Sequence, residues 1–279
     1  MVTNILQFDE IGYWSEIKLD IIKEYAQAYT RILSTKRLRF SYIDAFAGAG
    51  VHLSESKQEL VPGSPLNALR INPPFEHYYL IDLNGDRIEQ LRNFAEIAGR
   101  KDVTLLQGDC NQCLVESVYP RCRYEDYQRA LCILDPYGLH LDWEVIQQAG
   151  QMKSIDIFLN FPIMDINRNA LWRNMSRARK EGQNRLTAFW GDESWKEGAY
   201  AKQATLFGDD DPIKLENEQV ADAFGDRLRK IAGFKFVPKP IPMRNSTNAI
   251  VYYLFFASQQ PVAAKIVEDI FDKYKDKRA

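Results

Sequence analysis

The sequence predicts an α/β protein whose mostly parallel β-sheet is covered by helices on both faces. Short apolar segments alternate along the chain with segments in which apolar residues recur at helical spacing, as in a sheet with crossover helices. Four of the short segments end in an acidic residue, and the first of them also leads into a glycine-rich turn. Because ligands bind beside the carboxyl ends of such strands, the sequence also predicts a ligand site there.

The composition limits the classes of function. The 279 residues include 46% apolar and 27% charged residues, which is ordinary for a globular protein with a sizeable core. The net charge of −2 argues against a protein coated in basic surface for binding duplex nucleic acid. The first residues lack a basic segment followed by an apolar core, and the most apolar run, 249–257, is about half as long as a membrane-spanning helix. We therefore expect a cytoplasmic protein without a membrane segment.

The periodicity assigns each part of the chain to a helix or a strand. Residues 163–234 are polar and helical in pattern, so we expect a helical insertion within one domain formed by residues 1–279. Two late strands without a crossover helix between them, at 234–237 and 249–257, predict an antiparallel hairpin at one sheet edge, followed by a helix at 261–275. In chain order, the earlier elements are a helix at 14–33, a strand at 40–43, a polar loop, a helix at 64–71, a strand at 77–81, a helix at 84–97, strands at 103–106 and 130–134, a helix at 141–149 and a strand at 155–159.

The acids at the strand ends are the main candidates for binding residues. They are Asp44, Asp82, Asp109 and Asp135. A single Asp in such a place often caps a helix or starts a turn, but four in succession are more typical of a ligand site. After the first of them the chain turns through Gly48 and Gly50, where the backbone can bend sharply or approach a ligand closely. Carboxylates only accept hydrogen bonds, which suits them to ribose hydroxyls and to amino groups.

This arrangement of residues 40–160 and the last two strands resembles the class I S-adenosylmethionine-dependent methyltransferases. The resemblance implies a Rossmann-like, seven-stranded sheet of order 3-2-1-4-5-7-6 with the last strand antiparallel, and S-adenosylmethionine as the cofactor. It also implies that Asp82 binds the ribose hydroxyls and that Asp109 contacts the adenine amino group. The residues that would pack against the amino-acid part of the cofactor are Asp44, Phe46, Ala47, Gly48 and Gly50.

A dinucleotide-binding oxidoreductase is the competing interpretation of the same turn. Its fingerprint needs a third glycine and a helix that begins at once. Leu53 occupies the position of that glycine, and the next helix start is at Ser64. Asp82 also lies about ten residues beyond the usual spacing of about 20 from the glycines. NAD is therefore disfavoured, and S-adenosylmethionine, which has no pyrophosphate, does not need that helix end.

The candidate catalytic residues are Asp135, Pro136 and Tyr137. They lie where amino-methyltransferases carry an Asp/Asn-Pro-Pro-aromatic motif, and that resemblance implies that the acid accepts hydrogens from a target amine while the ring stacks on a base. The sequence has one proline rather than two, and the aromatic residue comes one place early. A strand-end turn with a structural Asp135 is the alternative, since Asp, Pro and Gly all favour turns.

Two further features bear on metals and partners. Cys110 and Cys113 have the spacing of half a zinc site, but no second pair of ligands follows, so we expect no metal. The insertion contains a basic stretch with two interpretations. Either it binds phosphates while Trp172 stacks on a base, or it is a solvated face of a helix. Its basic residues are Arg168, Arg173, Arg177, Arg179, Lys180 and Arg185. We expect Trp190 and Trp195 to pack the insertion on the sheet.

The whole chain resembles the three-Cys-motif partner protein family. The resemblance is carried by the leader with Trp14 and Lys18, the Asp-Ala-Phe-Ala-Gly-x-Gly turn, and the Gly-Ser-Pro, Leu-Asp-Pro-Tyr-Gly and Phe-Trp-Gly segments. It implies a methyltransferase fold and a separate partner protein that bears three cysteines. The sequence therefore predicts an S-adenosylmethionine-binding methyltransferase that acts on an amine or nucleobase. The alternative is a non-catalytic binding protein on the same fold, which would tolerate the incomplete motif at Asp135.

Overall fold

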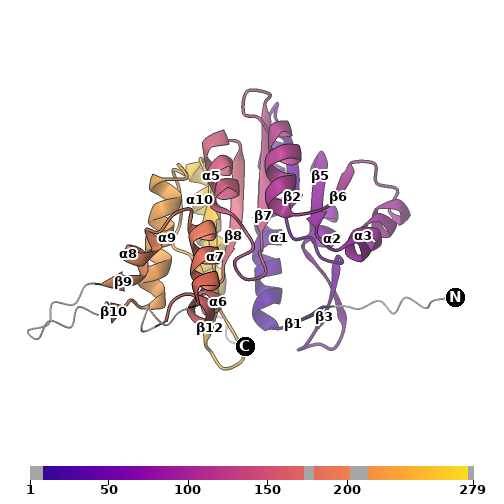
Figure 1. The fold of residues 1–279 in the computed structure, drawn as a ribbon. Coiled ribbons are helices and arrows are strands. Elements are labelled where there is room, and N and C mark those ends of the chain that lie inside the picture. Colours follow the sequence, from indigo (N-terminus) through magenta and orange to yellow (C-terminus); the bar gives the residue numbers. More distant parts are fainter. Residues whose placement is uncertain (1–8, 173–178, 202–212, 276–279) are drawn as a thin grey trace, which may run out of the picture.

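A seven-stranded sheet lies at the centre of the computed structural model, which describes residues 9–172, 179–201 and 213–275 (Figure 1). Its strands are β2 (Arg39–Asp44), β5 (His77–Asp82), β6 (Val103–Gln107), β7 (Gln128–Leu134), β8 (Ile155–Phe161), β11 (Ile241–Arg244) and β12 (Ile250–Ala257). They follow one another across the sheet in the order β6-β5-β2-β7-β8-β12-β11. The first five are parallel, and β12 runs antiparallel to both β8 and β11. The predicted α/β class with a mostly parallel seven-stranded sheet is confirmed.

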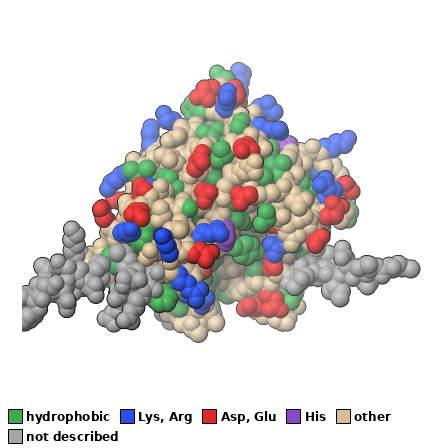
Figure 2. Space-filling view, viewed as in Figure 1, with side chains coloured by type: hydrophobic (Ala, Val, Ile, Leu, Met, Phe, Trp, Pro, Cys, Tyr) green, Lys and Arg blue, Asp and Glu red, His purple; other side chains and the backbone are tan. Residues whose placement is uncertain are grey.

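Helices cover both faces of this sheet because each strand has apolar side chains on both sides. One face packs on α1 (Tyr13–Leu33), α2 (Ser64–Leu69), α3 (Gly85–Ile97) and α10 (Pro261–Tyr274). The other packs on residues 110–122, α5 (Trp143–Met152), α6 (Ile163–Asn169), α7 (Lys180–Trp190), α8 (Trp195–Ala199) and α9 (Asn217–Lys230). On the face shown in Figure 2, Lys and Arg side chains gather over α6 and α7. Within the described residues, no helix is long and apolar enough to cross a membrane.

An aromatic cluster joins the predicted insertion to the sheet. The Phe224 ring of α9 lies 4.6 Å from the Phe161 ring at the end of β8 and 5.5 Å from the Phe189 ring of α7, measured between ring centroids. Trp190 and Trp195 are buried, which confirms their predicted packing role. Such aromatic pairs contribute about 0.5–1.5 kcal/mol each beyond the area that they bury. The description of residues 163–234 as an insertion within one domain stays our interpretation of the sequence.

Two segments differ from the sequence-based expectation. The loop expected after Gly50 forms a hairpin of β3 (Val51–Ser54) and β4 (Leu60–Pro62), and β1 (Asp9–Ile11) adds to it as a third strand. Phe236 makes a single bridge to Ser258 in place of the strand expected at 234–237, and the edge strand is β11. That strand contains Pro242, which lacks an N–H donor and is tolerated because an edge strand pairs on one side only.

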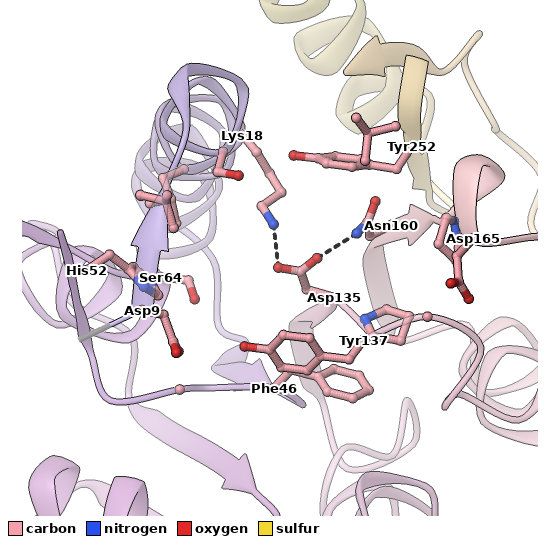
Figure 3. A pocket seen from close by; sticks show the side chains of 18 of the residues that line it. Asp9, Lys18, Phe46, His52, Ser64, Asp135, Tyr137, Asn160, Asp165 and Tyr252 are labelled. Atoms are coloured by element: carbon pink, nitrogen blue, oxygen red, sulfur yellow. Dashed lines mark hydrogen bonds and ion pairs between the residues drawn. The ribbon is translucent and has the colours of Figure 1, made fainter. Parts of the chain in front are cut away.

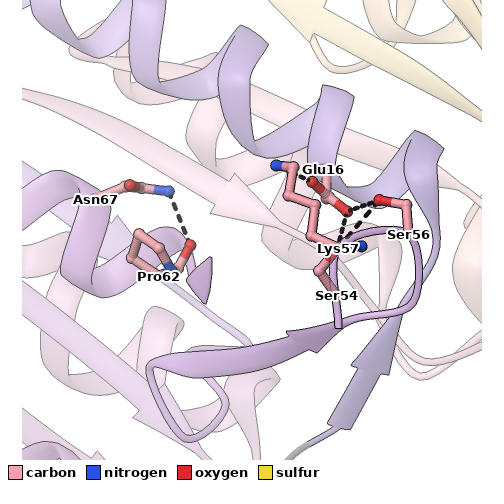
Figure 4. Close-up of polar contacts among 6 residues, drawn as sticks. All are labelled: Glu16, Ser54, Ser56, Lys57, Pro62 and Asn67. Carbon is pink, nitrogen blue, oxygen red and sulfur yellow. Dashed lines mark hydrogen bonds and ion pairs between the residues drawn. The ribbon is translucent and has the colours of Figure 1, made fainter. Parts of the chain in front are cut away.

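Contacts from α1 hold the hairpin in place (Figure 4). The Glu16 carboxylate of α1 accepts hydrogen bonds from the Ser54 hydroxyl at 2.6 Å and the Lys57 ammonium at 2.6 Å. At the other end of the hairpin, the Asn67 amide of α2 donates to the Pro62 carbonyl at 3.1 Å. The small sheet is therefore fixed at both ends to the helices that flank β2.

Two glycines in helix interiors give a matched test of the packing. A Cβ added to Gly150 in α5 would lie 2.1 Å from the Ala232 carbonyl oxygen, whereas one added to Gly225 in α9 would lie 3.4 Å from the Phe255 ring. We expect Gly150→Ala to lower the free energy of unfolding by about 2 kcal/mol or more. Gly225→Ala should raise it by about 0.5–1 kcal/mol, because Ala is the better helix former. Urea unfolding measures both, and equal effects would contradict the packing of α5 on the segment after α9.

Candidate functional site

A cavity of about 550 Å³ lies at the carboxyl ends of the central strands (Figure 3). Its walls come from the turn after β2, the segments after β7 and β8, the first turns of α1, and strand β1. Parallel strands bring their carboxyl ends to one edge of the sheet, which is why segments far apart in the sequence meet here. The cavity is lined, among others, by Asp9, Lys18, Phe46, Ala47, Gly48, His52, Ser64, Asp135, Pro136, Tyr137, Asn160, Asp165 and Tyr252.

The structure brings two of the predicted groups together in this cavity, whereas four predicted residues do not line it. The turn residues Phe46, Ala47 and Gly48 and the candidate catalytic residues Asp135, Pro136 and Tyr137 line the same cavity. The four predicted residues that do not line it are Asp44, Gly50, Asp82 and Asp109. Each of these four makes contacts that support the neighbouring backbone, as follows.

Asp44 supports the turn from inside the protein. It ends β2 and is buried, and its carboxylate accepts hydrogen bonds from the Tyr42 hydroxyl at 3.2 Å and the Phe46 amide at 3.3 Å. Burial raises the pKa of this carboxyl from 3.8 to about 6. Asp44 therefore shapes the path of the chain toward Gly48 rather than facing the cavity.

Asp82 connects the ends of β5 and β2. One oxygen of its carboxylate accepts a hydrogen bond from the Gly48 amide at 2.9 Å, and the other accepts one from the Asn84 amide at 2.8 Å. Gly48 has a φ of 63°, a left-handed conformation that favours glycine. Each carboxylate oxygen has a second lone pair, so Asp82 can accept further hydrogen bonds from a ligand.

Gly50 and Asp109 have local structural roles. Gly50 has a φ of 82°, and a Cβ there would lie 3.0 Å from the Leu91 side chain, so glycine permits both the turn and the contact with α3. Asp109 is exposed and caps the short helix α4 (Cys110–Gln112), because its carboxylate accepts a hydrogen bond from the Asn111 amide at 2.8 Å. The structure does not bring Asp109 into the cavity.

A partly buried ion pair at Asp135, between a buried lysine and a half-buried carboxylate, is the main feature that the sequence did not reveal. One carboxylate oxygen of Asp135 contacts the Lys18 ammonium, and the other accepts a hydrogen bond from the Asn160 amide at 2.8 Å (Figure 3). Burial alone would lower the pKa of Lys18, but the Asp135 carboxylate raises that pKa above its ordinary value, so the ammonium stays charged. The two residues are 117 positions apart, and no local pattern links them.

Arg87 was also missed, although it connects three parts of the site. Its guanidinium pairs with Asp9 of β1 at 2.7 Å and lies 3.8 Å from the Asp82 carboxylate. It also lies 5.9 Å from the centroid of the Tyr137 ring, within the range of a cation–π contact. Arg87 follows Asn84, the cap of α3, by three residues, and a basic residue one turn into a helix is the only local signal of its position.

Two polar atoms of cavity-lining residues have unused hydrogen-bonding capacity. His52 Nδ1 and Asn160 Oδ1 are both buried and have no partner among the described residues. Burial lowers the pKa of His52, which favours a neutral ring. An unpaired buried polar atom costs about 1–3 kcal/mol, so a ligand that supplies partners would gain that energy. The cavity is therefore suited to a polar ligand.

Among the described residues, the cysteines and the basic stretch lie outside this cavity, apart from Arg168, which lines it. Burial raises the pKa of Cys110 to about 12, so its thiol is a weak ligand for metals. Across the described ranges, no group of three or more His, Cys, Asp or Glu residues is arranged to hold a metal ion. Arg173 and Arg177 of the predicted basic stretch lie outside the described residues.

The fold resembles solved structures, although no family model and no curated protein matches the sequence. The chain is similar to protein LPL1258 from Legionella pneumophila, of the family DUF519, with 12% identity over 92% of each chain and a TM-score of 0.52. Weaker likenesses include a putative methyltransferase, yhhF, from Escherichia coli (11% identity, 85% of this chain and 86% of that chain, TM-score 0.35). Another is the N-terminal domain of EvdMO1 in the presence of SAH and D-fucose (10% identity, 86% and 83%, TM-score 0.43). The first likeness shows a shared fold.

The raised pKa of Asp44 predicts a pH-dependent stability. Because the folded-state pKa lies above the ordinary value, the folded protein holds this proton more tightly than the unfolded chain does. The carboxyl should therefore reduce stability by up to about 3 kcal/mol as the pH rises from about 4 to about 6. Asp44→Asn removes this effect, so the variant should gain stability relative to the parent over that range in urea unfolding.

Asp156→Asn serves as a positive control, because burial raises the pKa of that carboxyl to about 6 as well. Asp156→Asn should also gain stability relative to the parent as the pH rises over the same range. A difference between Asp44→Asn and the parent that stays constant from pH 4 to 7 would contradict the raised pKa of Asp44.

Proposed function

We propose that the protein binds S-adenosylmethionine in this cavity and transfers its methyl group to an amine. The observation that carries the proposal is the juxtaposition of the Phe46–Gly48 turn with Asp135 and Tyr137 across one cavity at the strand ends. The turn is the part of the chain that resembles a cofactor-binding loop, and the second group resembles an acceptor-binding motif. A volume of about 550 Å³ is within the usual range for small-molecule sites.

The residues present fit the proposed cofactor. Asp82 does not line the cavity itself, but it lies directly behind Gly48, which does, and it keeps acceptor capacity on both oxygens, which suits the hydroxyls of a ribose that reaches it. His52 and Asn160 add buried polar atoms without partners. When bound, S-adenosylmethionine supplies a methyl group on a positively charged sulfur. The protein's own part is to hold that group, exclude water and orient the acceptor.

Asp135 is proposed to orient the acceptor amine. Lys18 and Asn160 hold its carboxylate in one position, and each oxygen keeps one lone pair for a hydrogen of the amine. The two oxygens of Asp135, by accepting the hydrogens of the amine, favour a more pyramidal nitrogen, whose lone pair is then available for the methyl group.

The second candidate is a binding protein that uses the same fold without catalysis. It is favoured by one observation, which is that Lys18 and Asn160 already occupy both oxygens of Asp135. We also propose that the protein works in the cytoplasm and, from the resemblance to the three-Cys-motif partner family, that it works with a separate protein that carries three cysteines. These proposals are compatible with either function of the cavity.

The ribose role of Asp82 is tested by calorimetry with S-adenosylmethionine. Asp82→Asn replaces one acceptor oxygen with an NH₂ group, which then faces either the Gly48 amide or the ligand. The affinity for S-adenosylmethionine should therefore fall about tenfold or more. Asp86→Asn is the matched control, because Asp86 is an exposed acid in the first turn of α3. It should bind like the parent. No detectable heat with the parent at millimolar ligand would refute the cofactor proposal, and equal affinity of the two variants would remove Asp82 from the site.

The role of Asp135 is tested by labelled-methyl transfer to mixed nucleic acids, with and without the partner. Asp135→Ala should abolish transfer because it removes the acceptor oxygens, and it should destabilise the protein by about 3 kcal/mol because it leaves the Lys18 ammonium without its counter-ion. The double variant Lys18→Met/Asp135→Ala removes both charges, so it should regain most of the stability but none of the transfer. Transfer by the double variant would exclude a catalytic Asp135, and no transfer by the stable parent under any condition would favour the binding protein.

A further inference from the structure

A second cavity of about 490 Å³ adjoins the acceptor end of the first. The two cavities share Tyr137, Gly138 and Asp165 in their walls, and we call the pair the groove, which extends from the turn after β2 to the start of α7. The cofactor and an acceptor amine would lie in the first cavity. The second therefore offers room for a part of the acceptor that extends beyond the reacting group.

Cationic side chains line this groove. They are Arg168 at the end of α6, Arg179 just before α7, and Arg185 within α7, and all three are exposed. None of the three forms an ion pair with a described carboxylate, and Arg185 instead donates to His140 Nδ1 at 2.9 Å. The blue side chains over α6 and α7 in Figure 2 belong to the face that carries this groove.

Acids face the same groove and must be counted against these cations. At the α7 end, Asp165 accepts a hydrogen bond from the Asn169 amide at 2.9 Å, and Glu181 is exposed in the first turn of α7. The other end is lined by Asp9, Glu10 and Asp135, of which Asp135 pairs with Lys18 and Asp9 with Arg87. The excess of guanidinium groups, three against two carboxylates, is therefore confined to the part of the groove beside α6 and α7. Guanidinium groups bind phosphate with paired hydrogen bonds, so the unpaired arginines suit a phosphate-bearing ligand.

One exposed aromatic side chain lines the groove, and a second, which lines neither cavity, is hydrogen-bonded to the backbone of Arg168. The Tyr137 side chain is 64% exposed where the two cavities meet, although large aromatic residues are usually buried. Trp172 is 40% exposed, and its indole N–H donates to the Arg168 carbonyl at 2.8 Å, which holds the ring beside that arginine. Grooves that bind single-stranded nucleic acids combine such rings, on which bases stack, with cations that follow the phosphates.

We infer that the groove binds a single-stranded nucleic acid and presents one of its bases to Asp135. This inference rests on the proposed function, since it names the molecule to which the acceptor amine belongs. The amine is then the exocyclic amino group of an unpaired base beside Tyr137, and neighbouring phosphates contact Arg179 and Arg185. A base within a duplex cannot reach a cavity of this kind without leaving its stack, so an unpaired strand should be preferred.

The test is fluorescence anisotropy with labelled RNA and DNA strands of about 12 nucleotides, each compared with its duplex. The parent should bind the single strands more tightly than the duplexes. Arg179→Ala/Arg185→Ala should weaken this binding about tenfold and should reduce the slope of log K against log salt by about 1.4, since each lost phosphate contact is worth about 0.7. Tyr137→Ala should weaken binding without changing the slope.

The matched control is Lys230→Ala/Lys265→Ala, which removes the same charge from exposed positions in α9 and α10. It should bind like the parent. Equal affinity for single strands and duplexes, equal effects of the two double variants, or equally tight binding of poly-glutamate would each overturn the inference. Calorimetry with S-adenosylmethionine on the same variants separates this result from the proposed function, because Arg179 and Arg185 lie outside the first cavity and their loss should leave cofactor affinity unchanged.

Discussion

The position of β2 between two parallel neighbours is the constraint on which the candidate site depends. The ladder continues past the end of β2, because the Ala45 amide donates to the Ile133 carbonyl of β7 and the Ala47 amide donates to the Ile81 carbonyl of β5. The next amide, that of Gly48, donates to the Asp82 carboxylate. These hydrogen bonds go alternately to the β7 side and the β5 side, and together they fix the path of the turn. The pairing of β2 with β7 also determines where β7 ends relative to β2. The distance between the turn and Asp135 is therefore set by the sheet.

A second constraint comes from the first helix. Helix α1 crosses the sheet and is held at one end by the Lys18 contact with Asp135 and further along by a hydrogen bond from the Tyr25 hydroxyl to Asp156 at 2.7 Å. Buried ion pairs add little net stability, because desolvation offsets much of their attraction, but removal of one partner is costly. We therefore regard the pair as a device that fixes the register of α1 over the strand ends.

Much of the fold was predictable from the sequence, but the contacts between distant segments were not. The helix expected at 14–33 is observed at Tyr13–Leu33, because its apolar stripe is long and regular. The strand β11 was missed because Ile241–Arg244 is short and contains a proline, and its pairing with β12 outweighs its weak propensity. Asp82 was predicted at the site and supports it, whereas the Lys18 and Arg87 contacts depend on the tertiary fold and have no local pattern.

The pairing of Lys18 with Asp135 has a consequence for the choice of acceptor. Asp135, the carboxylate proposed to face the acceptor, is matched by the Lys18 cation. In the proposed reaction, this ion pair attracts a protonated alkylamine less than an isolated carboxylate would, whereas an uncharged aromatic amine enters without a Coulombic penalty. Selection among amines would then depend on shape and on hydrogen-bond geometry rather than on opposite charge.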